Sequence, residues 1–70
     1  MAPQEFRSIR VGLSLRQRDA AWMFNVLPRQ VVRWEAGAYA IPAPVSMLLI
    51  AYRDGLITPR WLVEHLGPPD

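Results

Sequence analysis

Two arginines four residues apart carry the clearest chemical signal in this sequence. Arg29 and Arg33 follow Pro28, a residue suited to the first turn of a helix. Residues at this spacing share one face of a helix, and each guanidinium offers a planar fork for bidentate contacts to phosphate or to guanine. A short helix with this face exposed would probe a DNA groove. The alternative is an ordinary charged face in contact with water.

The positive charge is unevenly placed along the chain. The formal net charge is only +2, but all 8 basic residues are arginine, and six of them fall between Arg7 and Arg33. This asymmetry favours a nucleic-acid partner for the N-terminal half. A GC-rich genome also produces an all-arginine composition, so the placement supports the interpretation better than the residue type does.

Composition indicates one folded domain over residues 1–70. Apolar residues make up 51% of the chain, too many for a disordered segment. There is no cysteine, hence no disulfide and no thiolate metal site. The segment Met1–Phe6 lacks the features of a signal peptide, and the apolar run Val45–Tyr52 is too short to span a bilayer. We therefore expect a cytoplasmic protein without a membrane partner.

The residue types do not predict an enzyme. The one histidine, His65, falls late in an apolar segment, where a capping or solvent-exposed role is commoner than catalysis. The 6 carboxylates are scattered, and the sequence has no glycine-rich loop to cradle phosphate. Ligands for a metal are lacking, so we expect neither a metal nor a cofactor.

Five short helices must position the arginines. Prolines and apolar residues at helical spacing predict helices over residues 3–12, 16–24, 28–36, 44–54 and 59–66. No segment alternates with the period of a strand. The predicted fold is therefore all-α, a compact bundle of five short helices.

Of the predicted connections, the one between the second and third helices reverses the chain most tightly. Asn25 tolerates the left-handed conformation that a tight turn needs. The adjacent Ala20 and Ala21 indicate that another backbone approaches closely, and Val31 and Trp34 are expected in the core. Two helices joined by so short a turn cross steeply, and the second can protrude into the major groove.

A sequence pattern runs through this region. The residues that carry it are Leu15, Gln17, Ala21, Val26, Val31, Trp34, Glu35 and Gly37, followed by Pro42 and Pro44. With this pattern, residues 6–52 resemble the Cro/repressor type, or Xre family, of helix-turn-helix regulators. The resemblance implies a lambda-repressor-like DNA-binding domain with its helix-turn-helix at 16–36. It also implies a transcriptional regulator that binds double-stranded DNA, most simply a repressor on a palindromic operator.

The resemblance assigns backbone and structural roles to several residues. Gln17 would donate to a phosphate at the start of the second helix, where free N–H groups favour an anion. Arg16 and Arg18 flank it and would contact phosphate as well. Arg10 and Glu35 occupy the positions of a partly buried ion pair that is common in the family.

Base contacts are expected from the third helix. Arg29 or Arg33 would pair with guanine, a contact worth about 1–3 kcal/mol of discrimination. Gln30 would read adenine or contact the backbone. Pro28 and Val32 would offer apolar contact to a thymine methyl.

Several positions depart from the family pattern. Arg16 and Leu27 stand where serine or threonine usually caps a helix, and the loss of a cap typically costs about 1 kcal/mol. Trp22 and Met23 are expected at the surface. An exposed pair of this kind indicates packing on another segment of the chain, on a dimer mate or on a different protein partner.

The C-terminal helices 44–54 and 59–66 are the expected region for homodimerisation. Trp61 and Leu62 are expected to fill the core. A symmetric interface would then use Leu56, Ile57, Val63 and Leu66. Such a dimer would place two recognition helices about 34–36 Å apart, which is one turn of DNA.

Two other functions fit the same residues. A helix-turn-helix fold can serve as a protein-binding antiactivator or a small partner-binding regulator, which the low net charge, the missing caps and Trp22 favour. The second of these functions is that of a DNA-bending recombination accessory of the excisionase type. Salt dependence separates DNA binding from protein binding, because phosphate contacts give log affinity a slope of about −0.9 per contact.

Overall fold

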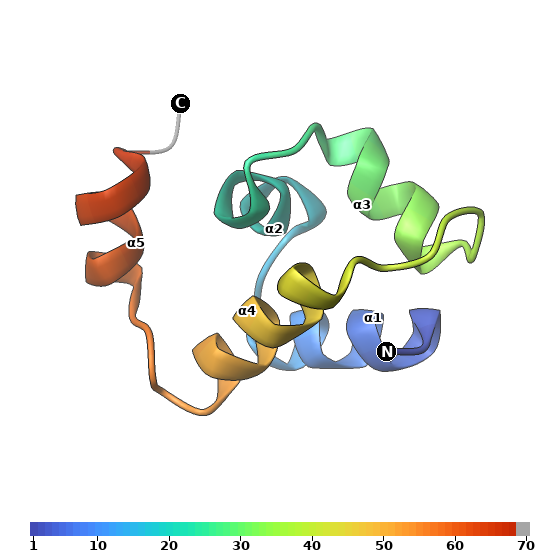
Figure 1. The fold of residues 1–70 in the computed structure, drawn as a ribbon, viewed down its shortest axis with the longest axis horizontal. Helices are drawn as coiled ribbons and strands as arrows, with labels where there is room; N and C mark the ends of the chain where they lie inside the picture. Colours follow the sequence, from blue (N-terminus) through green and yellow to red (C-terminus); the bar gives the residue numbers. More distant parts are fainter. Residues whose placement is uncertain (69–70) are drawn as a thin grey trace.

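Prolines open four of the five helices, at positions where the missing N–H of proline is no loss. The computed structural model describes residues 1–68, and every regular element in that range is helical (Figure 1). The helices are α1 Pro3–Gly12, α2 Gln17–Phe24, α3 Pro28–Glu35, α4 Ala43–Arg53 and α5 Pro59–Leu66. None of these helices has the length and apolarity to cross a bilayer. The all-α prediction is confirmed, and the predicted bounds differ by at most one residue at each end.

The first four helices end in the same way. One left-handed residue follows each of them, with φ between 56° and 77°: Ser14, Asn25, Gly37 and Gly55. The next residue then donates its N–H to a carbonyl five residues back, as Leu15 does to Arg10 at 3.1 Å. This Schellman arrangement satisfies carbonyls that the helix itself leaves free. The connections can consequently be short and reverse the chain sharply.

The core lies where the first four helices meet. Phe6, Phe24 and Trp34 form a triangle of rings whose centroids are 6.0 to 6.1 Å apart, in tilted and edge-to-face geometry. Ala20 and Ala21 are buried and let α2 pack closely against α3. Trp34 is 2% exposed, which confirms its expected place in the core.

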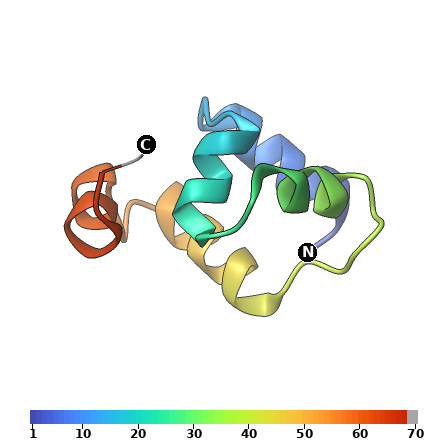
Figure 2. The same ribbon diagram turned by 90° about the horizontal axis from the view of Figure 1, so that it is seen from above.

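α5 lies at the end of the molecule away from the α3–α4 loop (Figures 1 and 2). Its one buried residue is Leu62, which lines the same hollow as Trp22 and Met23 of α2. Two expectations are wrong here. Trp61 is 40% exposed, because neighbouring residues of a helix point about 100° apart and Leu62 takes the inward position. Met23 is 3% exposed and therefore cannot form a surface contact, because residues of α4 and α5 lie beside it.

Ser14 provides a test of these helix ends. The left-handed conformation costs a residue other than glycine roughly 1–2 kcal/mol. We expect Ser14→Gly to raise the free energy of unfolding by up to about 1 kcal/mol, measured by urea denaturation. The control is Ser8→Gly, an exposed position within α1, which should lower the same quantity by about 0.5–1 kcal/mol. Similar losses in both variants would contradict the strain at Ser14.

Candidate nucleic-acid interface

A turn of three residues, Asn25, Val26 and Leu27, joins α2 to α3. The left-handed Asn25 reverses the chain, and the Val26 N–H donates to the Ala21 carbonyl at 2.9 Å. Val26 packs against the core, whereas Leu27 is 59% exposed. α3 therefore leaves the turn next to α2 and runs along the outside of the molecule (Figure 1).

α3 has one buried and one exposed face. Val31 and Trp34 are buried among α1, α2 and α4. The exposed residues of the helix among those predicted to read bases are Pro28, Arg29, Val32 and Arg33. Gln30 is half-buried. The structure thus brings the two arginines together on the side of α3 that faces solvent.

Tyr39 is part of this surface, and the sequence interpretation did not include it. The guanidinium carbon of Arg33 lies 5.5 Å from the centroid of the Tyr39 ring. Tyr39 sits in the loop after α3, two residues beyond the left-handed Gly37. An aromatic residue so soon after a helix-terminating glycine is the sequence signal that would have found it.

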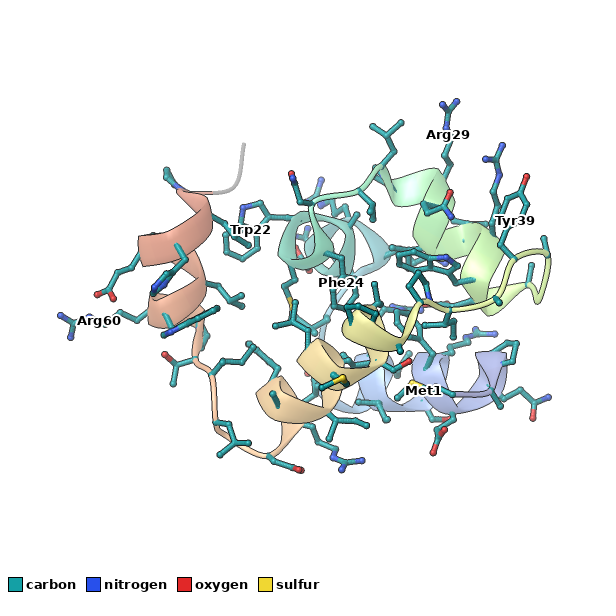
Figure 3. The ribbon with its side chains drawn as sticks, viewed as in Figure 1. Met1, Trp22, Phe24, Arg29, Tyr39 and Arg60 are labelled. Atoms are coloured by element: carbon teal, nitrogen blue, oxygen red, sulfur yellow. The ribbon has the colours of Figure 1, made fainter. Side chains whose placement is uncertain are left out.

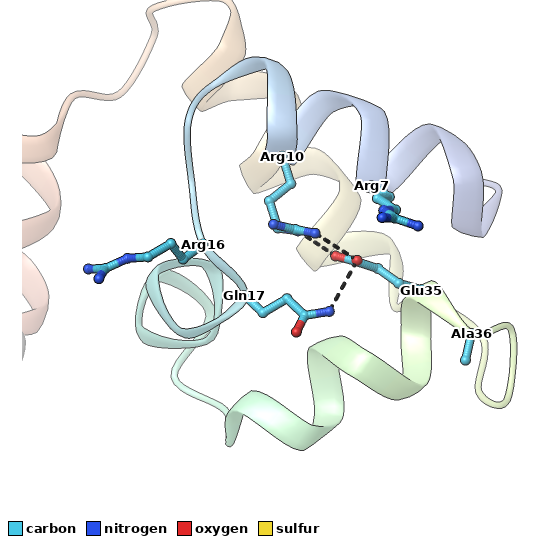
Figure 4. Close-up of a pocket in the computed structure, with 6 residues that line it drawn as sticks. All are labelled: Arg7, Arg10, Arg16, Gln17, Glu35 and Ala36. Carbon is cyan, nitrogen blue, oxygen red and sulfur yellow. Dashed lines mark hydrogen bonds and ion pairs between the residues drawn. The ribbon is translucent and has the colours of Figure 1, made fainter.

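Arg10 and Glu35 form a buried ion pair between α1 and the end of α3 (Figure 4). The Arg10 Nε and Nη2 atoms donate to the two carboxylate oxygens at 2.6 and 2.9 Å. The Arg10 Nη1 atom donates to the Leu15 carbonyl at 2.8 Å. The side chains are only 10% and 6% exposed, so the pair acts within the structure and is not a free surface charge.

Gln17 belongs to the same cluster. Its side-chain Nε2 atom donates to the Glu35 Oε1 atom at 3.4 Å, and the residue is half-buried (Figure 4). One amide N–H is therefore directed at Glu35, and the second remains for another acceptor. Spacing along the sequence does not reveal this contact, because it joins residues on different helices.

Asp19 stabilises the start of α2, where no serine or threonine stands. An arginine side chain has no acceptor atom, so it cannot accept from the free N–H groups at the start of a helix. Instead the Asp19 carboxylate accepts from the Arg16 guanidinium at 2.9 and 3.0 Å and from the Arg16 backbone N–H at 2.8 Å. The guanidinium hydrogen bond is the main reason that the pKa of Asp19 is lowered and that of Arg16 raised. Arg16 is thus held by Asp19 rather than free for phosphate.

The arginines divide into two groups. Four form ion pairs: Arg10 with Glu35, Arg16 with Asp19, Arg53 with Asp54, and Arg60 with Glu64. The other four have no carboxylate partner within residues 1–68, and they are Arg7, Arg18, Arg29 and Arg33. All of these unpaired arginines lie on α1, α2 or α3. The uncompensated positive charge therefore belongs to the N-terminal half of the molecule.

The side chain of His65 contacts Trp61 of the same helix. Its ring stacks on Trp61 with centroids 4.1 Å apart, and its Nδ1 atom lies 2.7 Å from the Trp61 carbonyl oxygen. His65 follows Trp61 by four residues on the same face of α5, so both contacts stay within that helix. Over the part of the chain that the structure describes, no three histidine, cysteine or acidic residues gather as metal ligands would.

No family model, curated protein or solved structure matches this chain.

The Arg10–Glu35 pair gives a prediction about stability. We expect Arg10→Ala to lower the free energy of unfolding by about 3–5 kcal/mol, because Glu35 would stay buried without a partner. The matched control is Arg60→Ala, which removes an exposed pair with Glu64 and should cost less than about 1 kcal/mol. Urea denaturation measures both values. Equal effects of the two substitutions would show that burial of the Arg10 pair has no special role.

Proposed function

We propose that this chain is a sequence-specific regulator of transcription, most simply a repressor, that binds double-stranded DNA with α2 and α3 as a helix-turn-helix. One observation carries the proposal. Arg29 and Arg33 lie on the exposed face of α3, opposite Val31 and Trp34, and neither has a carboxylate partner within residues 1–68. A helix fits the major groove, where an arginine can bond to the O6 and N7 atoms of guanine. Occupying an operator in this way would block a promoter.

The phosphate backbone would lie near the start of α2. The free N–H groups and the dipole of that helix end favour an anion. Arg18 is exposed there, and it lines a hollow together with Pro28 at the start of α3. Gln17 would use the amide N–H that Glu35 leaves free. Arg16 would contribute only by giving up Asp19, so Arg18 and Gln17 are the better candidates.

The proposed regulator acts as a homodimer through α5. Val63 and Leu66 are 41% and 42% exposed, and Leu56 before the helix is 78% exposed. Burying apolar surface of this kind is the main driving force of association. A two-fold axis at α5 leaves the exposed face of α3 free in each copy, which fits a palindromic operator.

Trp22 gives little support to the protein-binding alternative. It is half-buried and lines a hollow with Pro59 and Leu62, and its side chain lies between α2 and α5 (Figure 3). Its contacts are therefore largely within the chain. A regulator that uses this fold to bind protein would need a different surface.

Duplex selection from a random library, at a fixed salt concentration, tests the DNA-binding proposal. We expect Arg29→Ala and Arg33→Ala each to weaken binding to the selected duplex by about 1–3 kcal/mol and to relax sequence preference. The helical circular dichroism spectrum should survive, because both side chains are exposed. Arg53→Ala, an exposed arginine at the end of α4 that pairs with Asp54, is the control and should bind normally.

Two results would count against DNA binding. One is a library from which no sequence is enriched. The other is an affinity that does not fall with salt, since each phosphate contact should contribute a slope of about −0.9 to log affinity.

The dimer proposal has its own measurement. We expect Val63→Glu and Leu66→Glu to shift the protein to monomer in sedimentation equilibrium and to weaken binding to a full palindrome but not to a half-site. Val11→Glu, at a position on α1 that is 57% exposed, should leave both properties unchanged. A wild-type protein that is monomeric while bound to a palindrome would exclude this interface.

A further inference from the structure

The loop after α3 turns back and places the side chain of Tyr39 beside the exposed face of that helix. The Gly37 N–H donates to the Trp34 carbonyl at 3.2 Å, and the Ala38 N–H donates to the Arg33 carbonyl at 3.0 Å. Gly37 has φ of 76°, a conformation that glycine adopts at low cost and that reverses the chain here. As a consequence Tyr39 lies beside Arg33 instead of continuing away from the helix.

The contact between Arg33 and Tyr39 forms on the surface and not in the core. The Arg33 guanidinium carbon is 5.5 Å from the Tyr39 ring centroid, within the range of a cation–π interaction. Tyr39 is 53% exposed and Arg33 is exposed as well. Arg29 and Tyr39 project from the same side of the molecule (Figure 3). Tyr39 therefore extends the row of side chains that α3 presents to solvent.

We propose that Tyr39 is a positioning residue for DNA recognition, whose ring holds the Arg33 guanidinium in the orientation in which it meets a base. The inference rests on the proposed function and adds a specificity-determining residue to it. An arginine side chain loses much rotamer freedom when it is fixed at an interface. A contact that already forms in the free protein reduces this loss. Because an aromatic ring attracts the guanidinium through its charge, the N–H fork stays available for guanine.

Two substitutions at Tyr39 separate the ring from the hydroxyl. Tyr39→Phe keeps the aromatic ring, and Tyr39→Leu removes it while keeping an apolar side chain. The measured quantity is the ratio of affinities for the selected duplex and for a duplex altered at the base pair where Arg33→Ala loses its preference. We expect Tyr39→Leu to lower this ratio about two- to fivefold, the strength of an exposed cation–π contact. Tyr39→Phe should leave the ratio unchanged.

Two controls show whether the effect passes through Arg33. In the Arg33→Ala background, Tyr39→Leu should have no further effect on the ratio. In the free protein, the side-chain proton resonances of Arg33 should carry a ring-current shift that Tyr39→Phe retains and Tyr39→Leu abolishes. Thermal unfolding of both Tyr39 variants should match the wild type, since the ring is not in the core.

The outcomes distinguish this inference from the proposed function. If Arg33→Ala lowers the ratio but Tyr39→Leu does not, Tyr39 has no positioning role and DNA binding by α3 still stands. If Tyr39→Phe lowers the ratio as much as Tyr39→Leu, the hydroxyl is the important group and the inference is wrong. If the wild-type protein selects no duplex, the proposed function fails and this inference fails with it.

Discussion

The orientation of α3 depends on one buried ion pair. Arg10 of α1 holds the carboxylate of Glu35, the last residue of α3, and Gln17 adds a contact from α2. A rotation of α3 that separated the pair would leave a charge buried without a partner, which is strongly unfavourable. Trp34, one position earlier, is fixed in the core at the same time. Together these two residues determine which face of the helix is exposed, and Arg29 and Arg33 occupy that face.

Local signals in the sequence predicted the helices but not what covers them. Proline favours the first turn of a helix, and Asn25 and Gly37 tolerate the left-handed backbone that follows a helix. The helix starts at prolines and the helix ends before these two residues could therefore be predicted. Ser14 takes the same conformation without a distinctive residue type. Met23 was expected at the surface because the segments beside it, α4 and α5, follow only about twenty to forty residues later along the chain. A period of 3.6 residues tells which side chains share a face but not which distant segment meets that face.

The candidate site was predictable to the same extent. The shared face of Arg29 and Arg33 follows from their spacing within one helix, and the structure exposes both. The contact of Gln17 with Glu35 and that of Arg33 with Tyr39 each depend on how the chain turns between elements. Arg16 shows the same limit, because its guanidinium is held by Asp19 within the first turn of α2. Residue type alone predicts positive charge, whereas the fold decides which positive charges have acidic partners.

The small number of buried residues on α5 has a consequence for the dynamics of that helix. Only Leu62 of this helix is buried, whereas α1 to α4 share a common aromatic and aliphatic core. Segments with few buried apolar contacts open at a lower free energy than the global unfolding of the domain. Amide hydrogens of α5 should therefore exchange with solvent faster than those of α1 or α3, while the remainder of the protein stays folded. A second copy that covered α5 would slow this exchange, so that assembly and local order at the C-terminal end would be thermodynamically linked.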